Sequence, residues 1–389
     1  MEVIDPLSWS EIFAALGLRL WPVWAAIAVV FAVSVPLRQR LGLYGKMFGS
    51  TVGVVGFTLV MFWVFAALFA DLIITHDPLA QFSGMRNAGP GSPLRNPEGQ
   101  YAHFLLGGDA LARDVFSRMV MGAREVLRIA PFAAMISFMI GISLGLPAGY
   151  IGGRLDTGLT FLANLVLAFP VILLFFLLVA PEIQETALPR VMAGILFIVP
   201  VLFLSIMLNA RFFTQPVKRN LYVSAVVLVG LWAYSGLVFN ADPLGVWGLS
   251  ANLLNVFVAV VFVNAPTVFR IVRGITMDIK TRDYVAAAQT RGEGPWYIML
   301  WEILPNARGP LIVDFCLRIG YTTILLGTLG FFGLGVAPES PDWGSTINQG
   351  RRLLTVYPHA ALAPALALMS LVLGLNLMAD GLREESLKD

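Results

Sequence analysis

The chain has 389 residues, of which 58% are hydrophobic and only 13% are charged, with a mean hydropathy of +0.79. So few charges cannot cover the surface of a soluble protein of this length, so the composition excludes that class and indicates a polytopic membrane protein. The net charge of +2 gives no reason to expect nucleic-acid binding, because the basic residues stand in short loops between apolar runs.

Nine apolar runs approach the length of about 20 residues that a spanning helix needs. The first is flanked by Pro22 and Pro36, so it either crosses the membrane or lies in the interface. The nine runs extend from Leu20 to Leu37, Ser50 to Ile74, Leu127 to Tyr150, Thr157 to Ala180, Arg190 to Asn209, Leu221 to Phe239, Asn252 to Val272, Pro310 to Leu334 and Ala360 to Asp380. Prolines at positions 170, 266 and 364 are candidate kinks in these spans.

The positions of lysine and arginine predict the orientation, because loops rich in these residues stay in the cytoplasm. Basic residues follow the first, third, fifth, seventh and ninth runs. With nine spans these loops share one side, so we expect a cytoplasmic C-terminus and an acidic N-terminus outside. Arg190, Arg351 and Arg352 fall on the outer side, and the pattern does not explain them.

The long outer segment from about Thr75 to Val126 has the composition of a soluble loop, and its middle is rich in Gly, Pro, Ser and Asn. From Asp109 onward, apolar residues recur at helical spacing. We therefore expect Asp109 to cap a short amphipathic helix that continues toward the third span.

The inner loop between the seventh and eighth spans reads DIKTRDYVAAAQTRGEGPWYIMLWEILPNARGPL. Asp283 stands where an N-cap belongs, and Gly292 stands where a left-handed residue after a helix belongs. Gly294 and Pro295 break the chain, and proline suits the first turn of a second helix, which we expect to end near Pro305. The pattern predicts two short helices joined by a glycine hinge on the inner face of the membrane.

Three consecutive alanines, Ala286, Ala287 and Ala288, are expected to give the first of these helices a nearly bare face. Such a face can enter a groove on another protein, because no long side chain has to be ordered. The alternative is an ordinary connecting loop that happens to be helical, and the local pattern alone does not separate the two.

The loop resembles the EAA motif of binding-protein-dependent ABC permeases, which combines alanines, a glycine four residues beyond them and a terminal Leu-Pro. In that family this segment is the coupling helix that docks into a cleft of the ATPase subunit. Ala286 replaces the glutamate of the motif, and Glu302 stands where a polar residue or histidine is usual. The resemblance implies that the ATPase is contacted by Asp283, Tyr284, Ala286, Ala287, Ala288, Gly292, Leu304 and Pro305.

Two further stretches resemble dipeptide, oligopeptide and nickel permeases. LGGDALARDVFSRMVMGAREVL is similar to the segment before their second core span, although Gly108 and Ala112 depart from it. LGFFGLGVAPESPDWGSTINQGR and NLMADGLREESLKD are similar to the end of these proteins, with Ala379 in place of a glycine. The resemblance covers roughly residues 50–181 and 252–385.

This resemblance implies an all-α polytopic membrane protein with the six-helix core of a type I ABC importer permease and about three extra hydrophobic segments. We expect an N-terminal extra segment (1–49), a first core span (50–74), the outer loop (75–126), second and third core spans (127–181), an inserted helical hairpin (182–250), and the last three core spans (251–389) with the coupling loop (278–308). A lipid-facing or partner-facing role is expected for the hairpin, rather than a new transport site.

By the same resemblance, the chain is a multi-pass subunit of the bacterial inner membrane that imports peptides or similar small solutes. Its expected partners are a second permease, two ATP-binding subunits, a periplasmic solute-binding protein and membrane lipid. No Gly-rich loop ends in Gly-Lys-Ser or Gly-Lys-Thr, so ATP hydrolysis must come from other chains and the subunit is not an enzyme. The alternatives are an autonomous secondary transporter or channel, and a membrane-embedded enzyme. The sequence does not identify the solute.

The cysteine, the histidines and the charges within the spans are the remaining candidates for chemistry. Cys316 is the only cysteine, so a cysteine metal site is excluded, and the three histidines are far apart, so we expect no metal and no cofactor. Asp314 and Arg318 lie four residues apart within the eighth span and can pair on one helix face. Charges within a span indicate either a transport pathway or a local ion pair that fixes packing, and we favour the ion pair.

Overall fold

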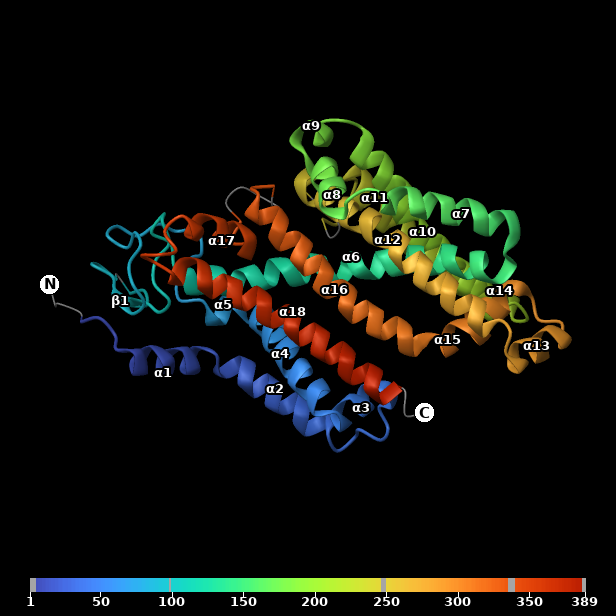
Figure 1. Ribbon diagram of the computed structural model, residues 1–389, viewed down its shortest axis with the longest axis horizontal. Helices are drawn as coiled ribbons and strands as arrows, with labels where there is room; N and C mark the ends of the chain where they lie inside the picture. The colour runs from blue at the N-terminus through green and yellow to red at the C-terminus, as the bar shows by residue number, and fades with distance from the viewer. Residues whose placement is uncertain (1–4, 98, 246–249, 335–339, 387–389) are drawn as a thin grey trace. The chain divides into compact units, whose positions relative to one another are not determined.

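The computed structural model describes residues 5–97, 99–245, 250–334 and 340–386, and helices make up most of it (Figure 1). It divides into two compact units, one of residues 1–131 and 316–389 and one of residues 132–315. Two long helices, α6 (Val115–Ile151) and α16 (Arg308–Phe331), contribute to both units. Parts of two segments that carried the family resemblance, residues 335–339 and 387–389, lie outside the described residues.

The first unit holds the two ends of the chain. Its remaining elements are α1 (Trp9–Arg19), α2 (Trp21–Ser34), α3 (Gly42–Lys46), the 3₁₀ turn η1 (Met47–Gly49), α4 (Thr51–Leu68), α5 (Ala70–Ile73), the antiparallel pair β1 (Ser92–Pro93) and β2 (His103–Phe104), α17 (Trp343–Arg351) and α18 (His359–Ser386). Helices α4 and α18 lie side by side (Figure 1). Glycines allow this approach, since a Cβ on Gly56 would lie 2.3 Å from the backbone nitrogen of Met378.

The second unit contains the remaining helices. They are α7 (Gly153–Leu167), α8 (Val171–Val179), α9 (Pro181–Gln184), α10 (Leu188–Arg211), α11 (Pro216–Phe239), α12 (Ala251–Ile279), α13 (Asp283–Thr290), α14 (Pro295–Tyr297), the π-helical segment η2 (Ile298–Ile303) and α15 (Leu304–Asn306). Helices α10 and α11 pack on each other as a hairpin.

Three glycines on one face of α6 let this helix pack closely against α12 in the second unit. Gly141, Gly145 and Gly149 are four residues apart and therefore lie on one face of α6. A Cβ on Gly145 would lie 2.8 Å from the Cβ of Val272, and the other two glycines are equally confined. Small residues at this spacing let two membrane helices meet backbone to backbone, where packing is the main source of attraction.

Seven of the nine predicted spans are single helices long and apolar enough to cross a membrane among the described residues. The first predicted run corresponds to α2, which passes this test only together with the preceding α1, at a bend of 54°, so its status as a span or an interfacial segment stays open. The fourth, predicted from Thr157 to Ala180, is likewise a bent pair, so whether it is one broken span or a re-entrant segment stays open. It is broken by 81° between α7 and α8, where Pro170 precedes α8 and has no N–H for a continuous ladder. Pro266 and Pro364, in contrast, lie inside α12 and α18.

The predicted helix cap at Asp109 is wrong, because the helix α6 begins later, at Val115. Residues 109–112 form a turn in which Ala112 has a left-handed backbone (φ 60°). Asp114 caps α6 instead, since its carboxylate accepts hydrogen bonds from the backbone N–H groups of Phe116 (3.2 Å) and Ser117 (3.3 Å). The expected short helix and the third span are one helix, α6.

Candidate functional site

The predicted coupling loop begins with the short helix α13. Its N-cap is Arg282, one residue before the predicted Asp283, which instead places its negative charge in the first turn near the positive end of the helix dipole. Val285 and Ala288 are completely buried, whereas Ala286 and Ala287 are exposed and Tyr284 is 38% exposed. The expectation that the three alanines share one bare face is therefore wrong, because a helix turns about 100° per residue and the third alanine faces inward.

The end of α13 is a Schellman motif. Gly292 has a left-handed backbone with φ 78°, as predicted. Its N–H donates to the carbonyl of Gln289 (3.0 Å), and the N–H of Glu293 donates to the carbonyl of Ala288 (3.3 Å). Glycine adopts this backbone without the steric cost that any side chain brings. The chain then reverses toward Gly294 and Pro295.

The second half of the loop is helical from Pro295 to Asn306, but a π-helical stretch, η2, interrupts it. The wide turn lies directly before Leu304 and Pro305, and Pro305 has no N–H to donate to the carbonyl of Trp301. Single π turns within helices are frequent at functional sites. Leu304 is half-buried and Pro305 is exposed in the first turn of α15.

Polar contacts fix the loop in place. Arg291 donates to the carboxylate of Glu302 at 2.8 Å and so ties the first short helix to the second. Gln289 donates to the hydroxyl of Tyr150 at 3.1 Å, which ties α13 to the end of α6. Glu302, a departure from the family pattern in the sequence, thus has a structural partner in this chain.

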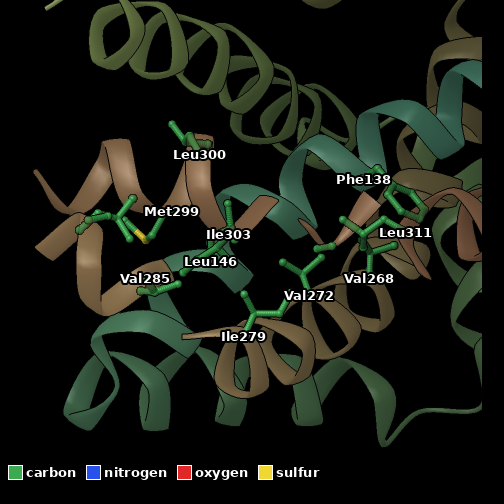
Figure 2. Close-up of a cluster of buried hydrophobic side chains, with 13 residues drawn as sticks. Phe138, Leu146, Val268, Val272, Ile279, Val285, Met299, Leu300, Ile303 and Leu311 are labelled. Atoms are coloured by element: carbon green, nitrogen blue, oxygen red, sulfur yellow. The ribbon is translucent and has the colours of Figure 1, made fainter. Parts of the chain in front are cut away.

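The buried side chains of the loop belong to an apolar cluster of the second unit (Figure 2). Its members come from α6, α12, the loop and α16, and include Leu146, Val272, Ile279, Val285, Ala288, Met299, Ile303 and Leu311. Because Val285 and Ala288 are the buried residues of α13, this short helix is held by two small side chains and keeps its remaining surface exposed.

The hairpin also reaches the loop. Phe203, Ile206 and Met207 of α10 pack against the cluster, and the guanidinium of Arg211 lies 4.5 Å from the ring centroid of Trp301. This contact joins the end of α10 to η2 and was not anticipated from the sequence, where the hairpin is a separate apolar insertion.

A groove of about 610 Å³ runs beside α13, between the end of α12 and the start of α16. Tyr284 lines it, as do Asp278 and Arg282, whose charges pair at 3.2 Å. Burial raises the pKa of the Tyr284 phenol, so this hydroxyl stays protonated and can donate a hydrogen bond. The groove therefore has a surface of mixed polarity, and its lining residues include no nucleophile paired with a general base.

Asp314 and Arg318 are both half-buried on α16. The guanidinium of Arg318 lies 5.6 Å from the ring centroid of Tyr321. Their pairing with each other stays a prediction. If a double substitution to alanine leaves transport and assembly unchanged, the pair has no role.

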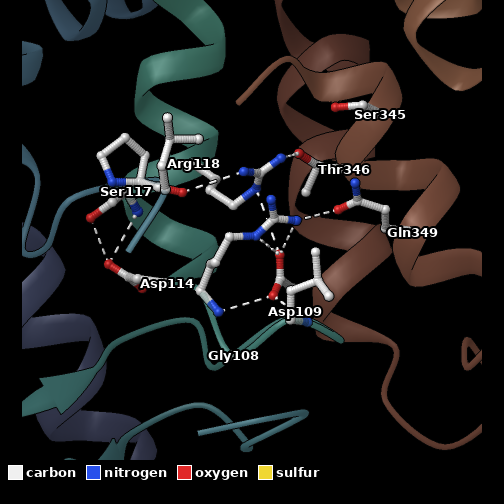
Figure 3. Close-up of polar contacts among 12 residues, drawn as sticks. Gly108, Asp109, Asp114, Ser117, Arg118, Ser345, Thr346 and Gln349 are labelled. Carbon is white, nitrogen blue, oxygen red and sulfur yellow. Dashed lines mark hydrogen bonds and ion pairs between the residues drawn. The ribbon is translucent and has the colours of Figure 1, made fainter. Parts of the chain in front are cut away.

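The first unit contains a buried polar network that was not predicted from the sequence (Figure 3). Asp109 accepts hydrogen bonds from the side chain of Arg113 at 2.8 Å and lies 3.8 Å from the guanidinium of Arg118. Arg113 also donates to Gln349, and Arg118 donates to Thr346 at 3.1 Å. All three charged groups are almost fully buried, so the outer segment before α6 is locked onto α17.

A second set of buried groups surrounds Asp114. Its carboxylate accepts hydrogen bonds from the hydroxyls of Thr75 and Ser117, both at 2.6 Å, and the ring nitrogen Nδ1 of His76 lies 3.2 Å away. The other ring nitrogen lies 2.8 Å from the carbonyl of Tyr101. The outer segment is therefore a folded structure rather than a loose loop. Only the spacing of acidic and basic residues in the stretch from Asp109 to Arg118 could have indicated this.

Comparisons with known proteins identify the family of the chain. Residues 141–384 match the family described as binding-protein-dependent transport system inner membrane component. The chain is 29% identical to the glutathione transport system permease protein of Pectobacterium atrosepticum, over 91% of each chain. It is 30% identical to the di/tripeptide transport system permease protein of Pseudomonas aeruginosa (90% of this chain, 91% of that one) and 27% identical to the dipeptide transport system permease protein of Haemophilus influenzae (92% and 96%).

These matches support the permease and not the autonomous transporter that was the alternative. They also agree with the absence of a nucleotide-binding loop in the sequence, because ATP hydrolysis lies in partner subunits. The chain belongs to the family of binding-protein-dependent transport system inner membrane components, and it is a non-catalytic, multi-pass permease subunit of an ABC importer.

Proposed function

We propose that this subunit imports peptides or related small solutes, and that it forms the translocation path together with a second permease. The named transport systems of its relatives, for glutathione, dipeptides and tripeptides, support this solute class. Two ATP-binding subunits and a periplasmic solute-binding protein complete the assembly. The inserted hairpin, residues 182–250, lies outside the transport path in this proposal.

We place the loop of residues 278–308, the C-terminus and the other basic loops in the cytoplasm, and the N-terminus with the outer segment in the periplasm. The distribution of lysine and arginine supports this orientation. It requires each of the two bent helix pairs to count as one span, which gives nine spans among the residues that the structure describes.

The observation that carries the coupling proposal is the exposure of α13. A helix of 8 residues is too short to be stable alone, and this one is held by the buried side chains of Val285 and Ala288 and by the polar contacts of its last turn with Tyr150 and Glu302. The surface of α13 that can enter a cleft in the ATPase consists of its exposed residues Asp283, Tyr284, Ala286 and Ala287. Gly292 ends the helix with a left-handed residue. Leu304 and Pro305 lie between α13 and α16 and connect the two.

In this mechanism, closure of the ATPase pair on ATP displaces α13 as a rigid body. The apolar cluster beneath α13 joins it to α6, α12 and α16, so the displacement reaches the spans directly. The spans then change between an inward and an outward opening. Energy for this change comes from the partner subunits, and the permease contributes only the mechanical connection.

Cross-linking tests the proposal. Ala287→Cys in the assembled transporter should form a cross-link to an ATP-binding subunit, and the yield should change when a non-hydrolysable ATP analogue is added. Leu111→Cys, on an exposed residue of the outer segment, is the control and should not cross-link to that subunit. The native Cys316 is 6% exposed and gives little background. Equal capture of the ATPase from both positions, or from neither, would contradict the proposal.

A further inference from the structure

An apolar cleft lies between the hairpin and the second half of the coupling loop. It has a volume of about 430 Å³ and is lined by Met207 of α10, Trp301 of η2, Leu304, Phe138 of α6, and Ile312 and Phe315 of α16. None of these side chains carries a charge. The cleft is therefore suited to an alkyl chain rather than to a polar solute.

Two arginines stand at this cleft without a counter-charge. Arg308 lines it, and Arg211 stacks on Trp301, one of the lining residues. Both are exposed, and neither side chain has an ion-pair or hydrogen-bond partner among the residues that the structure describes. The indole N–H of Trp301 is buried and also has no acceptor within the described chain. The apolar cleft thus has cationic groups and an unpaired donor beside it, which favours a ligand with an apolar chain and an anionic, oxygen-rich head.

The surroundings supply such a ligand. Only 11% of the apolar window of α10, and the same share of α11, is buried within the chain. A membrane helix that is so exposed faces lipid or another subunit. Further basic residues, Lys218 and Arg219, follow Arg211 at the turn of the hairpin, and basic sites between spans on the cytoplasmic side are known to bind anionic lipid head groups.

We propose that this cleft binds an anionic phospholipid, with an acyl chain in the cleft and the phosphate held by Arg211 and Arg308. The assignment to the inner leaflet rests on the orientation given under the proposed function. Because Trp301 and Leu304 belong to the coupling loop, the bound lipid joins the hairpin to that loop. The hairpin thereby acquires a role, which is to complete a lipid site that supports the connection between ATPase and spans.

Lipid binding to the purified, assembled transporter tests this proposal by native mass spectrometry. Phosphatidylglycerol and phosphatidylcholine with identical acyl chains are compared, with glycerol phosphate as the head group without chains. The variants are Arg211→Gln with Arg308→Gln, the cleft-filling Ile312→Trp, and Arg190→Gln as the matched control, since Arg190 is an exposed arginine near the other end of α10.

We expect phosphatidylglycerol to bind more tightly than phosphatidylcholine. Each surface cation contributes about a fivefold effect on anionic lipid affinity, so the double variant should bind phosphatidylglycerol about thirtyfold more weakly. Ile312→Trp should weaken both lipids, and Arg190→Gln should change neither. Unchanged unfolding temperatures without added lipid would show that the variants fold.

Four outcomes overturn the proposal: equal phosphatidylglycerol affinity in the double variant and the wild type, an equal loss in Arg190→Gln, binding of glycerol phosphate as tight as that of the lipid, or capture of the second permease instead of lipid by a photoreactive residue at position 312. The measurement needs no ATPase coupling, so it fails or succeeds independently of the cross-linking test at α13.

Discussion

Substitution of Gly292 tests whether the left-handed end of α13 is needed for coupling. The structure separates two costs at this position. A Cβ there would meet no atom within 4 Å, so crowding contributes nothing, and only the backbone conformation at φ 78° disfavours a side chain. That conformation costs a residue other than glycine about 1–2 kcal/mol. Such an energy corresponds to a change of about 5- to 30-fold in the ratio of molecules in which α13 keeps this left-handed end to molecules in which it does not.

The free-energy cost of the left-handed backbone depends on the side chain, so a series of substitutions at position 292 should have graded effects. Asparagine tolerates the left-handed region best, alanine less well, and a β-branched side chain least. In transporters reconstituted with the binding protein, the ratio of solute imported to ATP hydrolysed should fall in the series Gly292, Gly292→Asn, Gly292→Ala, Gly292→Val.

Gly294→Ala is the matched control. Gly294 is only two residues away and also has open space, but its backbone is extended (φ −68°, ψ 152°), which alanine adopts freely. It should therefore leave the ratio unchanged. Full coupling in Gly292→Val, or equal damage from Gly292→Ala and Gly294→Ala, would refute the reasoning.

Three further substitutions test the packing and the charges of the two units. Gly145→Leu forces a side chain into the contact between α6 and α12, where overpacking costs about 1–3 kcal/mol or more. The folded yield in size-exclusion chromatography should therefore drop. Gly158→Leu, whose side chain would point into open space, is the control and should leave this yield unchanged. Asp109→Ala leaves two buried arginines without their anion and should destabilise the outer segment by about 3–5 kcal/mol, seen as a lower unfolding temperature. Asp71→Ala removes an ion pair whose carboxylate is 74% exposed, and a comparable loss there would contradict this explanation. Burial raises the pKa of Asp342, so its charged form opposes folding, and stability is lost as the pH rises through the interval above its ordinary value of 3.8. Asp342→Asn keeps the cap of α17, so its unfolding temperature relative to the wild type should increase between pH 4 and pH 7, and a constant difference would count against the assignment.

Hydropathy located the membrane helices well because that signal is local. Pro170 was a candidate kink and the bend of 81° after α7 lies there, but the size of the bend could not be predicted. Pro266 and Pro364 stand within helices that continue through them, so a proline alone does not decide between a kink and a break. Neighbouring helices decide, because they supply or withhold partners for the freed backbone groups.

The coupling loop could be predicted in outline because its signals are short-range. Gly292 ends α13 as the sequence indicated. The inward position of Ala288 could not be predicted, since the cluster that buries it comes from helices far apart in the sequence. The same holds for Arg113 and Arg118, which resemble ordinary loop charges until Gln349 and Thr346 are brought beside them. The glycines at 141, 145 and 149 stand at regular spacing in the sequence and could have been recognised.

The three glycines on α6 (Gly141, Gly145 and Gly149) affect how a displacement of the coupling loop is transmitted within the second unit. Over two turns of α6 the glycines place no side chain of their own in the contact, and α12 fills it with the β-branched side chains of Val268, Val272 and Thr276, which have little rotational freedom. Helices α6 and α12 therefore resist sliding and twisting against each other. The coupling loop follows α12 directly. A push on the loop therefore moves both helices together, and little of the stroke is absorbed by side-chain rearrangement between them.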